Sequence, residues 1–449
     1  MANIDSSVFK AYDIRGVYPE QINEELAYLI GRAFVASLEC REVVVGRDAR
    51  ESSPKLHKAL LRGIMDQGAD VIDIGLTTTP MFYFTIAEYG HDAGIMITAS
   101  HNPARYNGMK LCREKAIPIG GETGLQDIRD LVEKNDFTEP ERKGEVKDKE
   151  PLNDYVRKIM SFSFDVKPIK IVVDAGNGMS PIVFPKLEEE LPIESVKMFF
   201  DIDCTFPNHE ANPSKDENTA DLRKKVKGEK AAMGVAFDGD ADRVAFVDEN
   251  GAAIPNDIIT ALIAEEMLAK NKGEKVLYEV RSSWSVRDTV KANGGTPVLW
   301  KAGHALIKEK MRNDDIMFGG EKSGHYFFRD FWYADSAMIA LVHVLNILSR
   351  KGKSLSELTN PLRRYEDSGE LNFEVKDKDE VISRVEDELK EEAVKVMHVD
   401  GTTMEFENWW FNLRKSNTEP VIRLNIEADT KEGLESAKQR LKSIIEMTE

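Results

Sequence analysis

The chain of 449 residues is poor in cysteine, in long apolar runs and in positive charge, and each shortage excludes a class of protein. Its three cysteines, Cys40, Cys112 and Cys204, are odd in number and far apart, so they cannot build a disulfide framework and indicate a reducing compartment, the cytoplasm. No apolar run reaches the roughly 18 residues that span a bilayer, because His343 and Asn346 interrupt the long apolar stretch near residue 340. The N-terminus also lacks the basic-then-apolar pattern of a secretion signal.

The shortage of positive charge limits the partners of this chain. Lysine and arginine number 61 against 79 aspartates and glutamates, which gives a formal charge of -18. Nucleic acids and anionic membranes are bound by basic faces, so we expect neither as a partner. A small anionic ligand would need local cations or a metal to overcome the repulsive overall field. At roughly 100–200 residues per domain, the length predicts three or four domains.

A weak internal repeat runs through the first three quarters of the chain, in the order of strands and loops more than in residue identity. In each copy a short apolar strand ends in a polar loop, and a second β-rich run follows at once. The strands with their loops are 94–97 with 98–103, 234–237 with 238–243, and 316–318 with 319–325. A strand that returns so soon cannot be parallel to its predecessor, so the sheets should be mixed. Strands alternating with helical segments predict an α/β class for each copy, with the loops converging at strand ends.

The pattern changes after residue 368 to strand, charged helix, strand and helix, which predicts a separate α+β domain with a fourth polar loop at 414–420. The charged stretch 139–150 is interpreted as the loop or linker that closes the first domain. We therefore expect three similar mixed-sheet α/β domains and a C-terminal α+β domain. Their expected bounds are 1–150, 151–253, 254–367 and 368–449.

The loop of the second copy carries three aspartates at alternate positions, Asp238, Asp240 and Asp242. Side chains two apart in an extended segment project to one side, and carboxylates brought that close need a cation. A hard metal follows, and Mg²⁺ suits few carboxylates plus a phosphate oxygen better than Ca²⁺ does. An EF-hand is disfavoured because Arg243 replaces the required glycine. A phosphatase with Asp238 as nucleophile is disfavoured because 244–248 predicts a returning strand; a metal-free turn stays open.

The loop of the first copy places the hydroxyl of Ser100 beside the imidazole of His101 at a strand end. A serine there could act as a nucleophile or carry a phosphoryl group, whose negative charge would need nearby cations. Lys110, Arg243 and a metal on the aspartate loop could supply them. Taken alone, the loop favours a plain turn, because serine, asparagine and proline are turn residues.

The third and fourth loops carry groups suited to a sugar and to an anion. The third presents a carboxylate, a hydroxyl and an imidazole at alternate positions between glycines, which suits a polyhydroxylated ligand. The fourth combines a guanidinium with hydroxyls and backbone amides, which together form an anion nest. Either loop alone could be a hairpin turn. However, phosphoryl transfer on a sugar phosphate requires all four features together: a phosphoryl carrier, a metal, sugar contacts and an anion site. The residues are Glu321, Ser323 and His325 in the third loop and Arg414, Ser416, Asn417 and Thr418 in the fourth.

Over essentially its whole length, the sequence resembles the α-D-phosphohexomutase family, and most of all its phosphomannomutase/phosphoglucomutase branch. The resemblance rests on AYDIRG at 11–16, TASHNP at 98–103, YNGMK at 106–110, DGDADR at 238–243, KAGH at 301–304, GEKSGH at 320–325 and RKSNTEP at 414–420. It implies four domains around a central cleft. It also implies that a phosphorylated Ser100 gives its phosphoryl group to a hexose 1- or 6-phosphate, of mannose or glucose. The resulting hexose 1,6-bisphosphate turns over and returns its other phosphate to the serine.

The resemblance also assigns roles to the motif residues. Lys110 and His304 match general acid/base positions, and Tyr12 and Arg15 match residues near the phosphoserine. Mg²⁺ is expected on Asp238, Asp240, Asp242 and the phosphoserine at Ser100. The expected catalytic residues are Ser100, His101, Lys110, Arg243 and His304. The expected substrate contacts are Tyr12, Arg15, Arg281, Glu321, Ser323, His325, Arg414, Ser416, Asn417 and Thr418.

Two departures from the family pattern concern substrate preference. Arg281 stands where many relatives have lysine, and Lys322 stands where they often have methionine or glutamine. A phosphoglucosamine mutase stays open as an alternative, although its phosphate loop usually contains Ser-Gly-Thr against the Ser-Asn-Thr that begins at Ser416. A non-catalytic sugar-phosphate or metal-binding homologue is the other alternative, but it would be favoured by loss of the serine, an aspartate or Lys110. The expected partners are small hexose phosphates, with neither nucleic acid nor membrane, and the chain is expected to be a monomer or homodimer.

Overall fold

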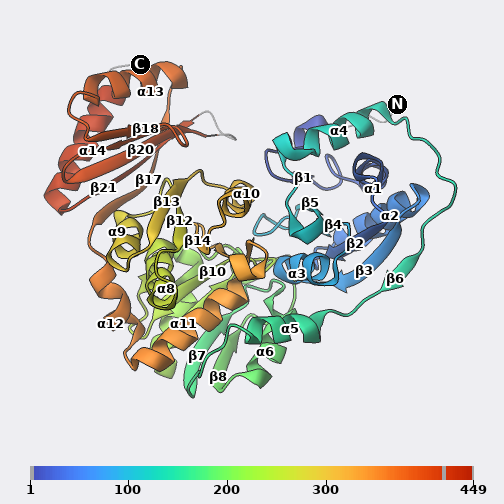
Figure 1. The fold of residues 1–449 in the computed structure, drawn as a ribbon, viewed down its shortest axis with the longest axis horizontal. Coiled ribbons are helices and arrows are strands. Elements are labelled where there is room, and N and C mark those ends of the chain that lie inside the picture. Colours follow the sequence, from blue (N-terminus) through green and yellow to red (C-terminus); the bar gives the residue numbers. More distant parts are fainter. Residues whose placement is uncertain (1–4, 417–420, 447–449) are drawn as a thin grey trace.

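The computed structural model describes residues 5–416 and 421–446, which form four sheets with their helices. The first and last sheets lie at the two ends of an arc, and the second and third lie between them (Figure 1). The expected three mixed α/β units followed by an α+β unit are confirmed. Among the described residues, we find no helix with the length and apolar character needed to cross a membrane.

The first sheet has the order β1-β5-β4-β2-β3-β6. The strand β5, which follows the Ser100 loop, returns antiparallel to β4, as the short connection predicts. The stretch 139–150 was expected to be a loop or linker; instead, its residues 146–148 add a parallel edge strand to β3. The strands are β1 (Ile14–Val17), β2 (Glu42–Arg47), β3 (Asp70–Leu76), β4 (Ala93–Ile97), β5 (Tyr106–Arg113) and β6 (Val146–Asp148), and the helices are α1 (Glu24–Leu38), α2 (Ser53–Asp66), α3 (Thr79–Tyr89) and α4 (Leu125–Lys134).

The second sheet repeats this plan in the order β11-β10-β9-β7-β8. Here β10 returns antiparallel to β9 directly after the aspartate loop. An EF-hand needs helices at that position, so the strand excludes it. The strands are β7 (Ile169–Asp174), β8 (Ile193–Met198), β9 (Met233–Phe237), β10 (Val244–Asp248) and β11 (Ala253–Ile254), and the helices are α5 (Leu152–Met160), α6 (Phe184–Glu190) and α7 (Ala220–Glu229).

The third sheet has the order β13-β12-β14-β15-β16, with β15 antiparallel to β14 across the third loop. Its long helix α11 begins where Ser336 caps the amide of Ile339 and ends at Gly352, whose φ of +62° suits glycine. The strands are β12 (Lys275–Glu279), β13 (Thr296–Trp300), β14 (Phe318–Gly320), β15 (Tyr326–Phe328) and β16 (Ala334–Asp335), and the helices are α8 (Asn256–Lys270), α9 (Trp284–Ala292), α10 (His304–Asp314), α11 (Ala337–Lys351) and α12 (Leu355–Thr359).

The fourth sheet is antiparallel throughout, in the order β17-β21-β20-β19-β18. The charged helix expected in this unit runs from Lys378 to Leu389, and a short strand follows it. The strands are β17 (Glu366–Glu374), β18 (Lys395–Met397), β19 (Thr402–Glu405), β20 (Trp409–Lys415) and β21 (Val421–Ala428), and the helices are α13 (Lys378–Leu389) and α14 (Lys431–Glu446).

One apolar core joins parts of the first three sheets, whereas the last sheet has a core of its own. The shared core contains α3, α8 and α11, and nearly every residue of α11 is buried. Burial of apolar surface stabilises a fold by about 25 cal/mol per Å². This shared core is therefore the main contact that holds the first three units together. The last unit is therefore attached to the rest mainly by its contacts with the third.

Candidate active site

Ser100 lies at the end of β4 in a strained and braced conformation. Its φ of +50° is left-handed, which costs a non-glycine residue about 1–2 kcal/mol. Thr98 Oγ1 accepts a hydrogen bond from the Ser100 amide at 2.9 Å, and the fully buried Arg50 donates to the carbonyl oxygens of Ser100 and Asn102 at 2.8 and 2.7 Å. These contacts fix the hydroxyl, which donates to Asp238 Oδ2 at 3.0 Å.

The aspartate loop meets this serine from the second unit. Lys110, on the strand that returns from the Ser100 loop, donates to Asp240 Oδ2 at 2.8 Å and to Asp242 Oδ2 at 2.6 Å. Gly239 must be glycine, because a Cβ there would lie 2.3 Å from the carbonyl oxygen of Ser100. The first two loops of the repeat thus interlock, as the sequence predicts.

The three aspartates offer a compact oxygen site. Ligand atoms of Asp238, Asp240 and Asp242 lie within 4.8 Å of one another, and all three side chains are buried. Burial, then the neighbouring Asp242 and Asp240, raises the pKa of Asp238. Asp240 Oδ1 is buried with no hydrogen-bond partner among the described residues. Clustered carboxylates with an unsatisfied oxygen fit a hard divalent cation.

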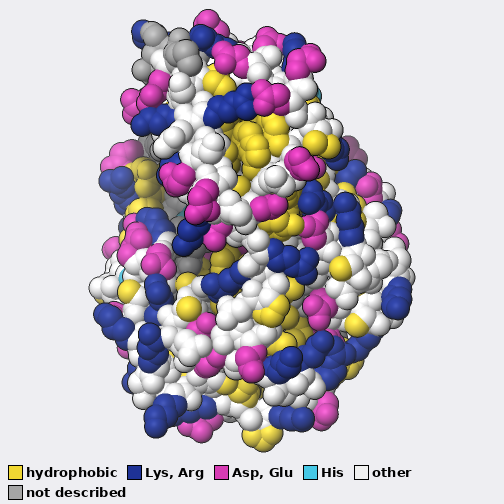
Figure 2. Space-filling view, turned by 90° about the vertical axis from the view of Figure 1, so that its left-hand side faces the viewer, with side chains coloured by type: hydrophobic (Ala, Val, Ile, Leu, Met, Phe, Trp, Pro, Cys, Tyr) yellow, Lys and Arg dark blue, Asp and Glu magenta, His cyan; other side chains and the backbone are white. Residues whose placement is uncertain are grey.

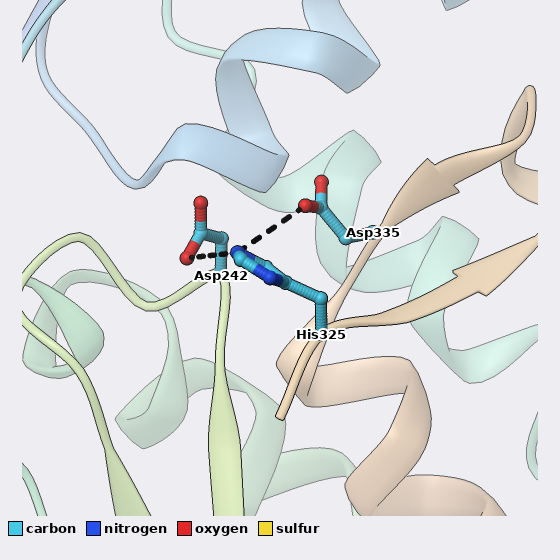
Figure 3. Close-up of side chains that lie close together, drawn as sticks. All are labelled: Asp242, His325 and Asp335. Atoms are coloured by element: carbon cyan, nitrogen blue, oxygen red, sulfur yellow. Dashed lines mark ion pairs between the residues drawn. The ribbon is translucent and has the colours of Figure 1, made fainter. Parts of the chain in front are cut away.

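His325 lies between two carboxylates of different units, Asp242 and Asp335 (Figure 3). Its Nε2 is 3.2 Å from Asp242 Oδ1 and 3.7 Å from Asp335 Oδ2, and its Nδ1 is 2.8 Å from Glu321 Oε2. Burial opposes protonation of the ring, but Asp242 outweighs it and the pKa of His325 rises to about 9. Lys308, fully buried, pairs with Asp335 at 2.9 Å. Asp242 and Glu321 therefore favour the charged form of this imidazole, whereas Arg243, whose Nε donates to His325 Nε2 at 3.2 Å, opposes it.

The third loop gathers the groups expected to contact a sugar. Ser323 Oγ lies 3.0 Å from His325 Nδ1, which also binds Glu321, so the three alternate side chains face one another as predicted. Arg281 lies between two carboxylates, because it donates to Glu279 at 2.9 Å and lies 3.6 Å from Glu321 Oε1. These contacts fix the carboxylate of Glu321.

Tyr12, Arg15 and His304 complete the wall between the first and third units. The rings of Tyr12 and His304 lie 6.3 Å apart, and those of His304 and His325 lie 5.8 Å apart. Burial, then Lys308 and Lys110, holds the pKa of His304 well below its usual value. Arg15 donates to Asn102 at 2.8 Å, next to the Ser100 loop. The imidazoles of His304 and His325 therefore lie side by side.

His101 and Arg243, which were also predicted to be catalytic, lie in this site. His101 Nδ1 is 3.0 Å from Ser100 Oγ, and burial, then Arg243 and Arg15, lowers the pKa of His101 well below its usual value. Arg243 is 3.8 Å from Asp238 Oδ2. Both therefore lie beside the serine and the aspartate loop.

The fourth loop is described only in part. Arg414 is mostly buried and donates to Glu370 Oε2 at 2.5 Å, and the amide of Ser416 donates to Val421. Asn417 and Thr418 lie outside the described residues. Ser100, Lys110, Arg243, His304 and His325 converge on one site through the contacts given above, whereas the contacts given for Arg414 and Ser416 lie within the last unit.

Several residues of this site have no motif in the sequence. Thr79 donates to Asp240 Oδ2 at 2.6 Å, and Arg50, Lys308 and Asp335 support Ser100 or His325 from distant segments. Among these residues, only Asp335 has a sequence feature that could have revealed it, because it ends a further strand that pairs with β15. The others are visible only once the chain is folded.

Comparison with known proteins gives matches over the whole chain. Models of the phosphoglucomutase/phosphomannomutase family match in order: α/β/α domain I at 6–139, domain II at 153–251, domain III at 255–365 and the C-terminal domain at 370–443. A phosphomannomutase of Vibrio cholerae is 44% identical over 434 residues, 94% of each chain. A protein of Xanthomonas campestris named for phosphohexose mutases is 42% identical over 422 residues, covering 93% of this chain and 94% of that one. The crystal structure of a phosphoglucomutase/phosphomannomutase family protein of Burkholderia thailandensis superposes with a TM-score of 0.92 at 35% identity, covering 99% and 98% of the two chains.

Proposed function

The chain belongs to the phosphoglucomutase/phosphomannomutase family, and from this premise we propose that it interconverts the 1- and 6-phosphates of mannose and glucose through a phosphoserine at Ser100. One observation carries the proposal: the Ser100 hydroxyl lies 3.0 Å from Asp238, inside a buried cluster of three carboxylates and Lys110. A non-catalytic homologue would have no need to maintain the strain at Ser100 or the buried charges around it.

A divalent cation fits this cluster. Asp238, Asp240, Asp242 and an oxygen of phosphorylated Ser100 would hold Mg²⁺, whose chemistry when bound is to neutralise charge on the phosphoryl oxygens and polarise the phosphorus. Asp240 and Asp242 outweigh burial and raise the pKa of Lys110, so this residue would bring a positive charge and a proton donor to the transferred group.

His304 and Lys110 carry the proposed proton transfers. His304, whose pKa is held well below its usual value by burial, then Lys308 and Lys110, can accept the proton of the attacking sugar hydroxyl, and the Lys110 ammonium can donate one to the leaving oxygen. In the first transfer the hydroxyl oxygen bonds to phosphorus while the bond to Ser100 Oγ breaks. The resulting hexose 1,6-bisphosphate turns over, and the second transfer reverses these changes on the other phosphate.

We assign substrate binding to residues of the third and fourth units. Glu321 can accept from two sugar hydroxyls, and Arg414 offers a guanidinium to the phosphate remote from the serine. The two orientations of the bisphosphate both present sugar hydroxyls to Glu321 and a remote phosphate to Arg414, as turnover of the bisphosphate requires. The local cations Arg243, Arg281 and Arg414 overcome the overall charge of -18. On the face shown in Figure 2, basic and acidic side chains are interspersed, so this face offers no extended basic surface for nucleic acid.

Two sugar epimers should be accepted, because the motif residues give no candidate for a group that reads the 2-hydroxyl, where mannose and glucose differ. Strong discrimination requires a buried polar group that the wrong epimer leaves unpaired. The three free cysteines agree with a reducing compartment, and we propose the cytoplasm as the location.

Intact mass and a substrate panel test this function. Mass spectrometry should find a fraction of the protein heavier by one phosphate, located at Ser100. The values of kcat/KM for mannose 1-phosphate and glucose 1-phosphate should agree within about a hundredfold, or about 2.7 kcal/mol. A larger ratio would show a 2-hydroxyl reader, and a preference for glucosamine 1-phosphate would favour phosphoglucosamine mutase. A protein without phosphate and without turnover would contradict the proposal.

A further inference from the structure

The sugar-binding loop and Arg414 are connected through a short irregular segment at the start of the last unit. Strand β17 has a bulge between Asp367 and Glu370, where its pairing with β21 shifts register. We propose that this bulge couples the two binding loops, with Lys322 and Asp367 as positioning residues for the phosphate grip of Arg414. The inference rests on the proposed function and deepens it.

The bulge is tied to the sugar loop at one end. Lys322, between Glu321 and Ser323, forms an ion pair with Asp367 and donates to the carbonyl of Arg281 at 3.3 Å. Its backbone amide lies 3.3 Å from Glu279 Oε1, the carboxylate that also binds Arg281. The methionine or glutamine that relatives often have at this position could not form the ion pair. Lys322 therefore points away from the sugar groups and toward the last unit.

The other end of the bulge carries the counter-ion of Arg414. Glu370 accepts from Arg414 Nη2 at 2.5 Å and lies 3.4 Å from Arg423 Nη1. The Nε of Arg414 is buried without a partner among the described residues, so the guanidinium has a donor to spare. Only two residues of chain, Ser368 and Gly369, separate the counter-ion of Lys322 from the counter-ion of Arg414.

Hydrogen bonds make the bulge a defined unit. The amide of Gly369, whose φ is +67°, donates to Asp367 Oδ1 at 2.7 Å. Ser368 Oγ accepts from the amide of Ile426 at 3.0 Å, which fastens the bulge to β21. Asp367 thus contacts Lys322 through one oxygen and shapes the bulge through the other. A change at Lys322 should pass through Asp367 to the carboxylate that orients Arg414.

A double-mutant cycle tests this coupling. Lys322→Met and Asp367→Asn should each raise KM for mannose 1-phosphate by about three- to tenfold, because the pair is partly exposed, and leave kcat within about twofold. The double variant should be no worse than either single one, since each removes the same link. Lys322→Arg should retain KM near the wild-type value, and Lys272→Met, at an exposed lysine of the same unit, should change nothing.

A second measurement does not depend on the proposed function. Titration with inorganic phosphate should protect the backbone amides of 409–415 from hydrogen exchange, with a dissociation constant that rises by the same factor in Lys322→Met. The coupling would be overturned if KM of the double variant rose by the product of the two single increases. It would also be overturned if the dissociation constant for phosphate were unchanged in Lys322→Met. Absence of turnover in the wild-type protein, with the phosphate response intact, would instead contradict the proposed function and leave the coupling supported.

Discussion

The region around Ser100 and the contact between the third and fourth units place charged groups in opposite environments. Around the serine, Asp238 and Asp240 are 0% exposed and Lys110 is 5% exposed. At the other contact the side chains of Lys322 and Asp367 are 25% and 36% exposed. Charges buried together are costly to separate, whereas exposed pairs contribute about 0–1 kcal/mol and are screened by salt. The reacting groups are therefore held rigidly, whereas the pair of Lys322 and Asp367 is a weak link at the other contact.

This difference suits a reaction in which one intermediate must bind in two orientations. In the proposed mechanism, Ser100 and the three aspartates act on whichever phosphate lies before them, so they have no need to move. The last unit would release and rebind its phosphate while the sugar turns, and a weak link such as that between Lys322 and Asp367 would be an advantage there. Removing groups from each region should show the two kinds of effect.

The largest effect is expected from Ser100→Ala. The variant should keep its thermal unfolding midpoint and lose turnover by about 10⁴-fold or more, because it removes the acceptor of the phosphoryl group. Steady-state assays with mannose 1-phosphate and calorimetry of unfolding check both parts. Near-normal activity in this variant would exclude a phosphoserine mechanism.

Removal of divalent cations should abolish turnover almost as completely. Without a cation, three carboxylates beside a phosphoserine repel one another by several kcal/mol at low effective dielectric. Chelator followed by added Mg²⁺ should restore the rate. Calorimetric titration should show weaker Mg²⁺ binding in Ser100→Ala, because a phosphate ligand is missing. Full activity in excess chelator would contradict the metal assignment.

The sequence predicts the serine region well for a physical reason. Each of its loops follows a buried strand, and a strand end fixes where the next side chains lie, so Ser100, Lys110 and Asp240 could be brought together without coordinates. Parts that depend on packing between distant segments could not be predicted. Arg50 and Lys308 carry no local signal, and the coupling of Lys322 to Asp367 follows from how the last two units meet. The three-residue strand at 146–148 was missed because its sequence is charged and exposed.

A smaller effect is expected in the second region from Arg414→Ala. Loss of a charged contact to the remote phosphate should lower kcat/KM for mannose and glucose substrates alike. The loss of transition-state stabilisation should be about 2–5 kcal/mol. Kinetics of both substrates measure the loss, and Arg440→Ala, at an exposed arginine of the same unit, is the matched control. A loss below tenfold would place the phosphate elsewhere.

The smallest effect concerns how the stability of the contact between the third and fourth units depends on pH. Glu427 of β21 accepts hydrogen bonds from the amide of Trp284 and the indole of Trp410, both at 2.8 Å, and so joins α9 to the last sheet. Burial raises the pKa of Glu427 to about 7, from 4.5, against hydrogen bonds that favour the charged form. In the pH range between these values the folded protein binds more protons than the unfolded one. The free energy of unfolding should therefore fall as pH rises from about 4.5 to 7, by at most about 3 kcal/mol.

Glu427→Gln removes this titration while keeping an oxygen acceptor for both donors. The variant should differ little from the wild type at pH 4.5 and become relatively more stable as pH rises to 8. Hydrogen exchange of the amides around Trp284 and Trp410 at several pH values, corrected for intrinsic exchange, measures the stability of this contact directly, and Glu432→Gln, at an exposed glutamate, is the control. Because Glu427 lies away from Ser100, exchange of the Ser100 loop should respond equally to pH in both proteins. If the variant shows the same pH dependence as the wild type around Trp284, the attachment of the last unit does not depend on the protonation of Glu427.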